Sequence, residues 1–260
     1  MTPAEEAAAV RRAVIQAAAG RPPVWALDFD GTLVPFADHP AAVRLPDPVR
    51  RDLGRLPSRG MPVLVLSGRS RADLATFFGP DFPGDLVGNH GLDWPPDLAP
   101  PDVPPAPPAV WRRRLDELLR PWPEAWVEDK GATWAVHWRA VPQHRQDAVR
   151  TALAQFAAAL DKPDFAARFG NHVLDIFPAA ANKGRALKRW LERRVGTDWP
   201  RAVLVVAVGD DLTDEDMFAA VEGRGLGIIV GARAPTRASL RLSGPEAVAA
   251  LLRSFAEAPP

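Results

Sequence analysis

The chain has 260 residues, of which 47% are hydrophobic and 25% charged, a composition typical of globular rather than disordered proteins. Lys and Arg total 32 and Asp and Glu total 32, so the zero formal charge argues against binding to nucleic acid or an anionic membrane. There is no cysteine, which excludes disulfides, thiolate zinc sites and a Cys nucleophile. The best apolar run, residues 202–208, is far shorter than the roughly 20 residues of a membrane span. We therefore expect a cytoplasmic protein with one large domain or two small ones.

Short apolar runs and helical stretches alternate along the chain. Residues 3–19 have the spacing of an amphipathic helix. Five apolar runs with little alternation predict strands that are covered on both faces, at 24–27, 63–66, 85–87, 203–208 and 226–230. Helical stretches are expected at 47–56, 71–78, 183–195 and 213–221. This alternation predicts an α/β fold with a doubly wound, Rossmann-like parallel sheet.

The middle of the chain has a different pattern. Residues 95–108 are rich in proline and predict a linker. The segment after the linker predicts an αββαββ order, with helices at 109–120 and 143–160 and strands at 125–130, 133–139, 165–169 and 172–177. We expect an α+β domain at 109–178, inserted into a core domain formed by 1–94 and 179–260.

Asp28 and Asp30 follow the first predicted strand. Alternation along a strand puts both carboxylates on one side, where they repel each other unless a cation lies between them or one is protonated. One could act as a nucleophile that forms an acyl-phosphate, and the other as an acid and then a base. The alternative is an ordinary Asx-rich turn at a strand end.

A second acidic cluster, GDDLTDED at 209–216, follows another predicted strand. Carboxylates at the ends of adjacent strands can hold Mg²⁺. The same segment suits a helix start, with Thr213 as N-cap and acidic residues in the first turn. We expect Asp210 to bind metal and Asp214 mainly to cap the helix, and both Asp211 and Asp214 remain ambiguous as ligands.

Two further segments offer phosphate-binding groups. Ser67 and Gly68 follow a strand, and a hydroxyl with free N–H groups at a helix start would bind phosphate, although both are ordinary turn residues. Lys183 opens a helix, where a cation is unfavourable for the helix dipole. It is therefore either retained to neutralise a phosphate or is a solvated lysine at a loop end.

The inserted domain carries polar residues on successive strands. Glu128 and Lys130 share one face by the period of two, and so do His137 and Arg139. Such stripes usually form the solvated face of a one-sided sheet. Most of the tryptophans of this segment are expected to be core or packing residues, with stacking on a sugar ring as the alternative.

Together these residues resemble the haloacid dehalogenase superfamily of phosphatases. DFDGTL at 28–33 is similar to its first motif, SGR at 67–69 to its second, Lys183 to its third and GDD at 209–211 to its fourth. The closer resemblance is to the trehalose-6-phosphate phosphatase family, and it spans about residues 24–252. It is carried by SGR at 67–69, GNHG at 88–91, ExK at 128–130, HxR at 137–139, NKG at 182–184 and GDDxTDED at 209–216.

The resemblance implies a reaction and roles. The family hydrolyses trehalose 6-phosphate, a step of trehalose biosynthesis, with Mg²⁺ and an aspartyl-phosphate intermediate. Asp28 would be the nucleophile, Asp30 the acid and then the base, and Mg²⁺ would be held by Asp28, the main-chain carbonyl of Asp30 and Asp210. The phosphate would be bound by Ser67, Gly68 and Lys183. The inserted domain would be a cap, and sugar contacts would come from Arg69, Asn89, His90, Glu128, Lys130 and Asp175, with His137, Arg139 and Asn182 as weaker assignments.

One departure and several alternatives remain at this point. The family's strand before the third motif usually ends in Glu, an apolar residue, a basic residue and Pro, whereas here Asp175 replaces the Glu and Phe177 the basic residue. A phosphatase of another sugar phosphate, such as glucosyl-3-phosphoglycerate or sucrose 6-phosphate, is therefore the main alternative. A phospho-accepting signalling domain has no use for Asp30 or an insert, and dehalogenation needs no phosphate-binding charge. The intact acidic pair argues against a non-catalytic sugar-phosphate-binding protein, and we expect a monomer that acts on a small molecule.

Overall fold

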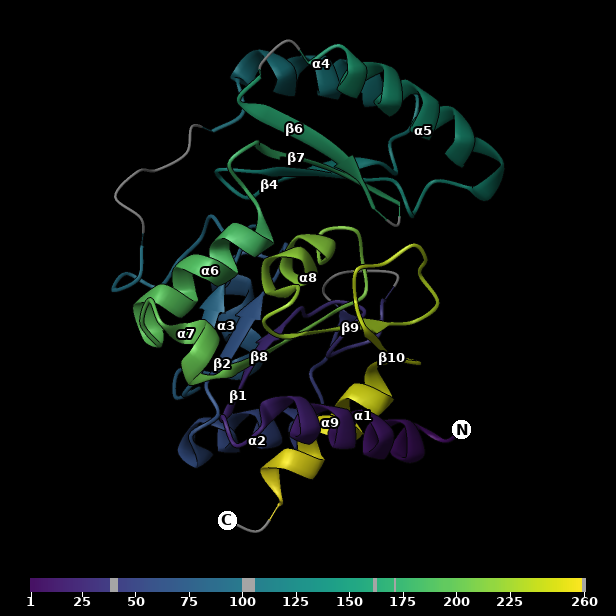
Figure 1. Ribbon diagram of the computed structural model, residues 1–260. Coiled ribbons are helices and arrows are strands. Elements are labelled where there is room, and N and C mark those ends of the chain that lie inside the picture. Colours follow the sequence, from purple (N-terminus) through teal and green to yellow (C-terminus); the bar gives the residue numbers. More distant parts are fainter. Residues whose placement is uncertain (38–41, 100–105, 161–162, 171, 259–260) are drawn as a thin grey trace. The chain divides into compact units, whose positions relative to one another are not determined.

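The computed structural model describes residues 1–260 except 38–41, 100–105, 161–162, 171 and 259–260 (Figure 1). Contacts between residues divide the chain into two compact units, the first formed by Met1–Pro100 with Asn182–Pro260 and the second by Pro101–Ala181. The finer boundaries expected from the sequence stay a prediction, and part of the expected linker, at 100–105, lies outside the described residues.

The first unit is built on a parallel sheet of six strands, in the order β10-β9-β8-β1-β2-β3 (Figure 1). Strands β1 and β8 are neighbours, with Leu27 opposite Val208. The bounds of the strands are β1 Pro23–Leu27, β2 Val63–Leu66, β3 Asp85–Val87, β8 Leu204–Gly209, β9 Leu226–Val230 and β10 Leu240–Leu242. The predicted doubly wound parallel sheet is confirmed.

Helices cover both faces of this sheet. Along β1, Trp25 and Leu27 belong to one apolar cluster while Val24 and Ala26 belong to the other, because successive side chains point to opposite faces. The first cluster is completed by α1 (Pro3–Ala18), α2 (Asp47–Arg55), α3 (Arg71–Phe78) and α9 (Pro245–Ala256). The second is completed by α6 (Lys183–Arg194), α7 (Trp199–Ala202) and α8 (Glu215–Val221). The result is a three-layer unit whose strands are buried on both sides, as their unbroken apolar runs predicted.

The second unit has an antiparallel sheet of four strands in the order β4-β5-β7-β6. Val136, Leu174 and Ile176 point to the side on which both helices pack, and they share one apolar cluster with Trp111 and Leu153. The elements are α4 Ala109–Leu119, β4 Trp126–Asp129, β5 Trp134–His137, α5 Gln143–Ala158, β6 Phe165–Phe169 and β7 Val173–Pro178. This order confirms the predicted αββαββ insert.

Some details of the first unit differ from the expectations. The 3₁₀ turn η2 (Pro57–Arg59), the short helix α7, the edge strand β10 and helix α9 were not predicted. Helix α8 begins at Glu215 and its cap position is Asp214, so the prediction of Thr213 as N-cap is wrong. The Asp214 carboxylate makes no cap hydrogen bond and points elsewhere. Among the described residues, no helix combines the length and the apolar character needed to cross a bilayer.

Candidate active site

The carboxyl ends of β1 and β8 bring two aspartates together. Asp28 directly follows β1 and Asp210 directly follows β8. The two ends are tied by the Asp28 N–H, which donates to the Val208 carbonyl oxygen at 2.9 Å. In a doubly wound sheet this edge is where ligands bind, so both side chains stand at the expected position.

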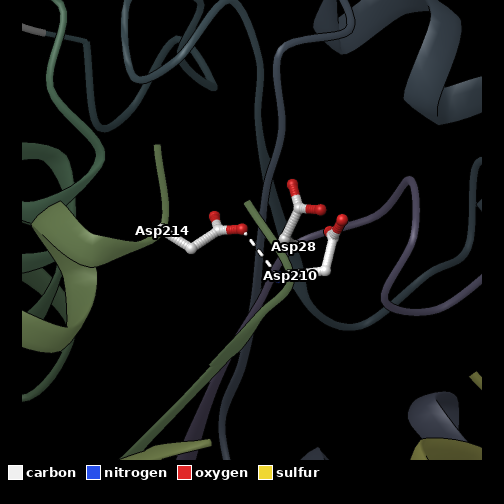
Figure 2. A group of neighbouring side chains, drawn as sticks. All are labelled: Asp28, Asp210 and Asp214. Carbon is white, nitrogen blue, oxygen red and sulfur yellow. Dashed lines mark hydrogen bonds between the residues drawn. The ribbon is translucent and has the colours of Figure 1, made fainter. Parts of the chain in front are cut away.

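A third carboxylate completes the group. Asp28, Asp210 and Asp214 each offer an oxygen, and these oxygens lie within 4.8 Å of one another (Figure 2). Asp214 is fully buried and its Oδ2 accepts hydrogen bonds from the N–H groups of Asp210 at 2.9 Å and Asp211 at 3.0 Å. Gly209 permits this turn, because a Cβ there would lie 2.3 Å from the Asp214 Cγ. The acidic segment therefore folds back on itself to place Asp214 inside the site.

Lys183 joins two of these carboxylates. It is the first residue of α6, and the cap residue Asn182 accepts a hydrogen bond from the Arg185 N–H at 2.8 Å. The Lys183 Nζ donates to Asp28 Oδ1 at 2.6 Å and to Asp214 Oδ1 at 2.7 Å, and its side chain is only 2% exposed. Burial lowers the pKa of Lys183, but the two carboxylates outweigh burial and raise it, so the side chain stays an ammonium.

The three carboxylates are not fully neutralised by one ammonium. Burial raises the pKa of Asp28 well above its usual value; Lys183 opposes this shift, and the charges of Asp214 and Asp210 add to it. Burial and then the Asp214 charge raise the pKa of Asp210 to about 7. A divalent cation would neutralise the negative charge of these largely buried carboxylates, and hard oxygen ligands suit Mg²⁺. The donor set therefore fits a divalent metal ion.

Asp30 is held by Arg69 outside this carboxylate group. Arg69 Nε donates to Asp30 Oδ2 and Nη2 to Asp30 Oδ1, both at 2.7 Å, and Nη1 donates to Asp73 Oδ2 at 2.8 Å. The guanidinium lies 5.4 Å from the ring centre of Phe29 and 5.2 Å from that of Phe77. The planar fork of Arg69 thus orients the Asp30 carboxylate, and its expected contact with the sugar stays a prediction.

The loops after β2 and β3 pack together. The His90 N–H donates to the Ser67 carbonyl at 2.9 Å and the Asn89 N–H to the Arg69 carbonyl at 2.7 Å. Asn89 and His90 have φ values of 49° and 54°, in the left-handed region that asparagine and histidine tolerate better than most residues. A Cβ on Gly68 would lie 2.7 Å from the His90 ring, so any larger residue there would have to displace that ring. The SGR and GNHG motifs thus form one structure at the carboxyl edge.

Thr32 and Asp211 both lie near Asp210, but only the Thr32 side chain is hydrogen-bonded to it. Thr32 Oγ1 donates to Asp210 Oδ1 at 3.2 Å, a contact that was not predicted. Asp211 is 42% exposed at its side chain and its Oδ1 lies 3.3 Å from Arg233 Nη1. Asp211 is not part of the group of three carboxylates, whereas Asp214 is. Of the two ambiguous metal ligands, the geometry therefore favours Asp214.

The second unit gathers its predicted residues on one face of its sheet. Glu128 is opposite Ala135 and Ala135 is opposite Asp175, so Glu128 and Asp175 project to the same side. Glu128 Oε2 lies 2.9 Å from His137 Nε2 and 3.6 Å from Lys130 Nζ. Burial raises the pKa of Glu128, but His137 and Lys130 outweigh burial and lower it.

Trp126 and Arg139 lie near the end of strand β5, Trp126 because it is opposite His137 on the neighbouring strand β4. The ring of Trp126, which is 40% exposed, stacks on that of His137 with centroids 4.4 Å apart, and this pair was not predicted. Arg139 follows β5, and its carbonyl oxygen accepts a hydrogen bond from Gln146 at 3.3 Å. We call the side of the sheet with Trp126, Glu128, His137 and Asp175 the polar face, opposite the side on which the helices pack.

Comparisons with solved structures define the class. A structure of the C-terminal domain of a trehalose-6-phosphate phosphatase from C. albicans has a TM-score of 0.78 and 21% identity, and the match covers 95% of this chain and 96% of that one. A phosphatase of the haloalkanoate (HAD) enzyme superfamily from Bacteroides thetaiotaomicron has a TM-score of 0.58 and 16% identity, and the match covers 90% and 95% of the two chains. The chain thus has the fold of a haloacid dehalogenase-type phosphatase, a Rossmann-like core with an inserted α+β unit.

Sequence comparison identifies the family. A family model described as trehalose-phosphatase matches residues 26–246. The trehalose-6-phosphate phosphatase of Escherichia coli (strain K12) is 34% identical over 228 residues, which cover 85% of this chain and 81% of that protein. The chain belongs to the trehalose-phosphatase family and is a phosphoric monoester hydrolase.

Proposed function

We propose that this chain hydrolyses trehalose 6-phosphate to trehalose and inorganic phosphate, in trehalose biosynthesis, with Mg²⁺ and through an aspartyl-phosphate on Asp28. The observation that carries the proposal is the arrangement of buried Asp28, Lys183 and Asp214 with the half-buried Asp210 at the carboxyl edge, in a chain 34% identical to the E. coli enzyme. Phosphoryl transfer needs mainly positioning and charge neutralisation, and this site supplies both.

Asp28 is the nucleophile in this proposal. Lys183 fixes its Oδ1 at 2.6 Å, which leaves the other carboxylate oxygen to attack phosphorus. The new bond joins that oxygen to phosphorus, and the bond between phosphorus and the sugar oxygen breaks. A bound Mg²⁺ would be held by Asp28, the main-chain carbonyl of Asp30 and Asp210, with Asp214 in reach, and it would supply positive charge against the carboxylates and the phosphoryl oxygens. Lys183, Ser67 and the Gly68 N–H bind the phosphate oxygens.

Asp30 moves the protons. As an acid it delivers a proton to the leaving sugar oxygen, and as a base it takes a proton from the water that attacks the aspartyl-phosphate. This second attack breaks the bond between phosphorus and the Asp28 oxygen and restores both carboxyl groups. The two hydrogen bonds from Arg69 fix the Asp30 carboxylate in one orientation, so Arg69 is a positioning residue.

Sugar recognition falls to the second unit in this proposal. Glu128, Lys130 and Asp175 offer acceptors and a donor for hydroxyl groups, and His137 fixes the Glu128 carboxylate. We further assign residues 1–94 and 179–260 to the catalytic core, 95–108 to a linker and 109–178 to a cap that reads the sugar. Further contacts to the sugar would come from Asn89, His90, Arg139 and Asn182. In this proposal the enzyme acts in the cytoplasm, and it acts as a monomer.

Phosphate release from four substrates tests the function. Trehalose 6-phosphate should be preferred over glucose 6-phosphate, sucrose 6-phosphate and glucosyl-3-phosphoglycerate by roughly 100-fold or more in kcat/KM, because unmatched hydroxyl partners cost binding. Another preferred sugar phosphate would keep the mechanism and contradict the substrate. One observation favours this second candidate function, the hydrolysis of another sugar phosphate: Phe177 is apolar at a position where the family pattern is basic.

Metal removal should abolish activity reversibly. EDTA is expected to stop phosphate release, and Mg²⁺ in excess should restore it and raise the thermal unfolding temperature, since a ligand at about 100 times its Kd adds about 2.7 kcal/mol of stability. Asp210→Asn should lose most of this Mg²⁺-dependent shift. Asp211→Asn should keep it, because the Asp211 carboxylate pairs with Arg233 instead. Equal loss of the shift in both variants would contradict the assignment of Asp210.

A further inference from the structure

The polar face carries one more charged residue, Arg168 on β6. In register, Arg168 lies opposite Asp175 of β7, Asp175 lies opposite Ala135 of β5, and Ala135 lies opposite Glu128 of β4. Residues that face each other across neighbouring strands project to the same side of a sheet. Arg168 is therefore the fourth member of a row that crosses the whole sheet on the polar face.

The Arg168 side chain is held in place by Phe177. Phe177 lies opposite Ala166, two residues before Arg168, so its ring is on the same face. The Arg168 guanidinium lies 5.5 Å from the ring centre, and Phe177 is buried, with 4% of the residue exposed. A guanidinium over a buried aromatic ring is attracted to it and loses less freedom when it binds a ligand. Phe177 stands where the family pattern is basic, and the neighbouring strand brings a cation to that ring.

Without Arg168, this row of four residues has no side-chain hydrogen-bond donor. Glu128 and Asp175, when ionised, only accept hydrogen bonds, while each sugar hydroxyl both donates and accepts. A guanidinium beside a carboxylate offers donors and acceptors to neighbouring hydroxyl groups at once. We propose that Arg168 is a substrate-binding residue that donates hydrogen bonds to hydroxyl oxygens of the sugar, next to Asp175, which accepts from them. This inference rests on the proposed sugar-phosphatase function.

Another arginine of the same unit provides a matched control. Arg150 of α5 lies over the ring of Phe169, with 5.9 Å from its guanidinium to the ring centre. Phe169 is opposite Leu174, which belongs to the apolar cluster on the helix side of the sheet. Arg150 and Arg168 thus make the same kind of contact on opposite faces, and only Arg168 belongs to the polar row.

The test compares Arg168→Met, Arg168→Lys and Arg150→Met as full-length proteins. The substrates are trehalose 6-phosphate and p-nitrophenyl phosphate, which has no sugar hydroxyls. Arg168→Met should raise KM for trehalose 6-phosphate by about tenfold or more, as expected for a lost charged hydrogen bond, and leave p-nitrophenyl phosphate turnover unchanged. The inhibition constant of trehalose should rise in parallel while that of inorganic phosphate stays constant. Arg168→Lys should be intermediate, and Arg150→Met should match the wild type.

Each other result counts against the inference. Equal kinetics in Arg168→Met and Arg150→Met would overturn it, and so would a rise in the inhibition constant of phosphate but not of trehalose. Parallel losses with both substrates, together with a lower thermal unfolding temperature in Arg168→Met and Arg168→Lys, would show a structural role instead. A wild-type chain that hydrolyses p-nitrophenyl phosphate but no sugar phosphate would overturn the proposed function before any variant is compared.

Discussion

Replacing Asp28 by Asn is expected to reduce kcat for phosphate release by at least about 1,000-fold, since the amide cannot act as the nucleophile. The fold should survive. Asn has the same shape, and its amide oxygen can still accept the hydrogen bond from Lys183 Nζ. The raised pKa of Asp28 means that its ionised form costs stability at neutral pH, so the neutral side chain should not lower the unfolding temperature of the metal-free protein.

The measurement pairs kinetics with chemical trapping. Acid-quenched wild-type protein should carry label from a substrate with a radioactive phosphate, and Asp28→Asn should carry none. Asp85→Asn is the matched control, because Asp85 begins β3 at the other end of the sheet and is bound by Arg194 at 2.7 Å and Trp190 at 2.7 Å. It should keep both turnover and label. Turnover that survives in Asp28→Asn would refute the assigned nucleophile.

The strands of the first unit were predictable because their burial leaves a direct mark on the sequence. The four residues of β2 are all buried, as are the last four residues of β1, so each strand reads as an unbroken apolar run. Polar residues that follow such runs must lie at the carboxyl edge, so the sequence alone places Asp28 and Asp210 at the same edge, and the observed pairing of β1 with β8 makes them neighbours.

The sequence of the edge strand β10 gives a weaker signal for secondary structure than the sequences of the central strands do. Strand β10 has three residues, and the exposed Arg241 lies between Leu240 and Leu242, a pattern too short to recognise as a strand. Helix α9 begins with Pro245 and buries Leu251 and other apolar residues at helical spacing, so the sequence does carry a signal for this helix.

The interactions that tie the site together could not be predicted from local patterns. Arg69 and Asp30 are 39 residues apart, and nothing around either residue indicates that their side chains meet. The sequence around Asp214 suits a helix cap, and only the tertiary fold shows that its carboxylate turns back to the N–H of Asp210 and binds Lys183. Residue types at strand ends are thus readable from the sequence, whereas their partners depend on how loops from distant segments pack.

Replacing Lys183 by Met is expected to cost about 3–5 kcal/mol of stability in the metal-free protein, because it leaves buried carboxylates without their partner. The side chains of Asp28 and Asp214 are 8% and 0% exposed, so water cannot replace the ammonium. Mg²⁺ should restore part of this stability, since it brings positive charge to the same carboxylates. Activity should remain at least about 100-fold below wild type even with Mg²⁺, because the charge that binds the phosphate is lost.

A double-mutant cycle separates this electrostatic role from simple packing. Lys188 lies on the exposed side of the same helix, so Lys188→Met should change neither the chemical unfolding midpoint nor turnover. Lys183→Met combined with Asp214→Asn removes both partners of the 2.7 Å ion pair, and its loss of stability should be smaller than the sum of the two single losses. Additive losses would show that the two residues do not interact energetically. A coupling that disappears when Mg²⁺ saturates the protein would show that the metal takes over the neutralising role of the lysine, which is the behaviour expected if one site holds both cations.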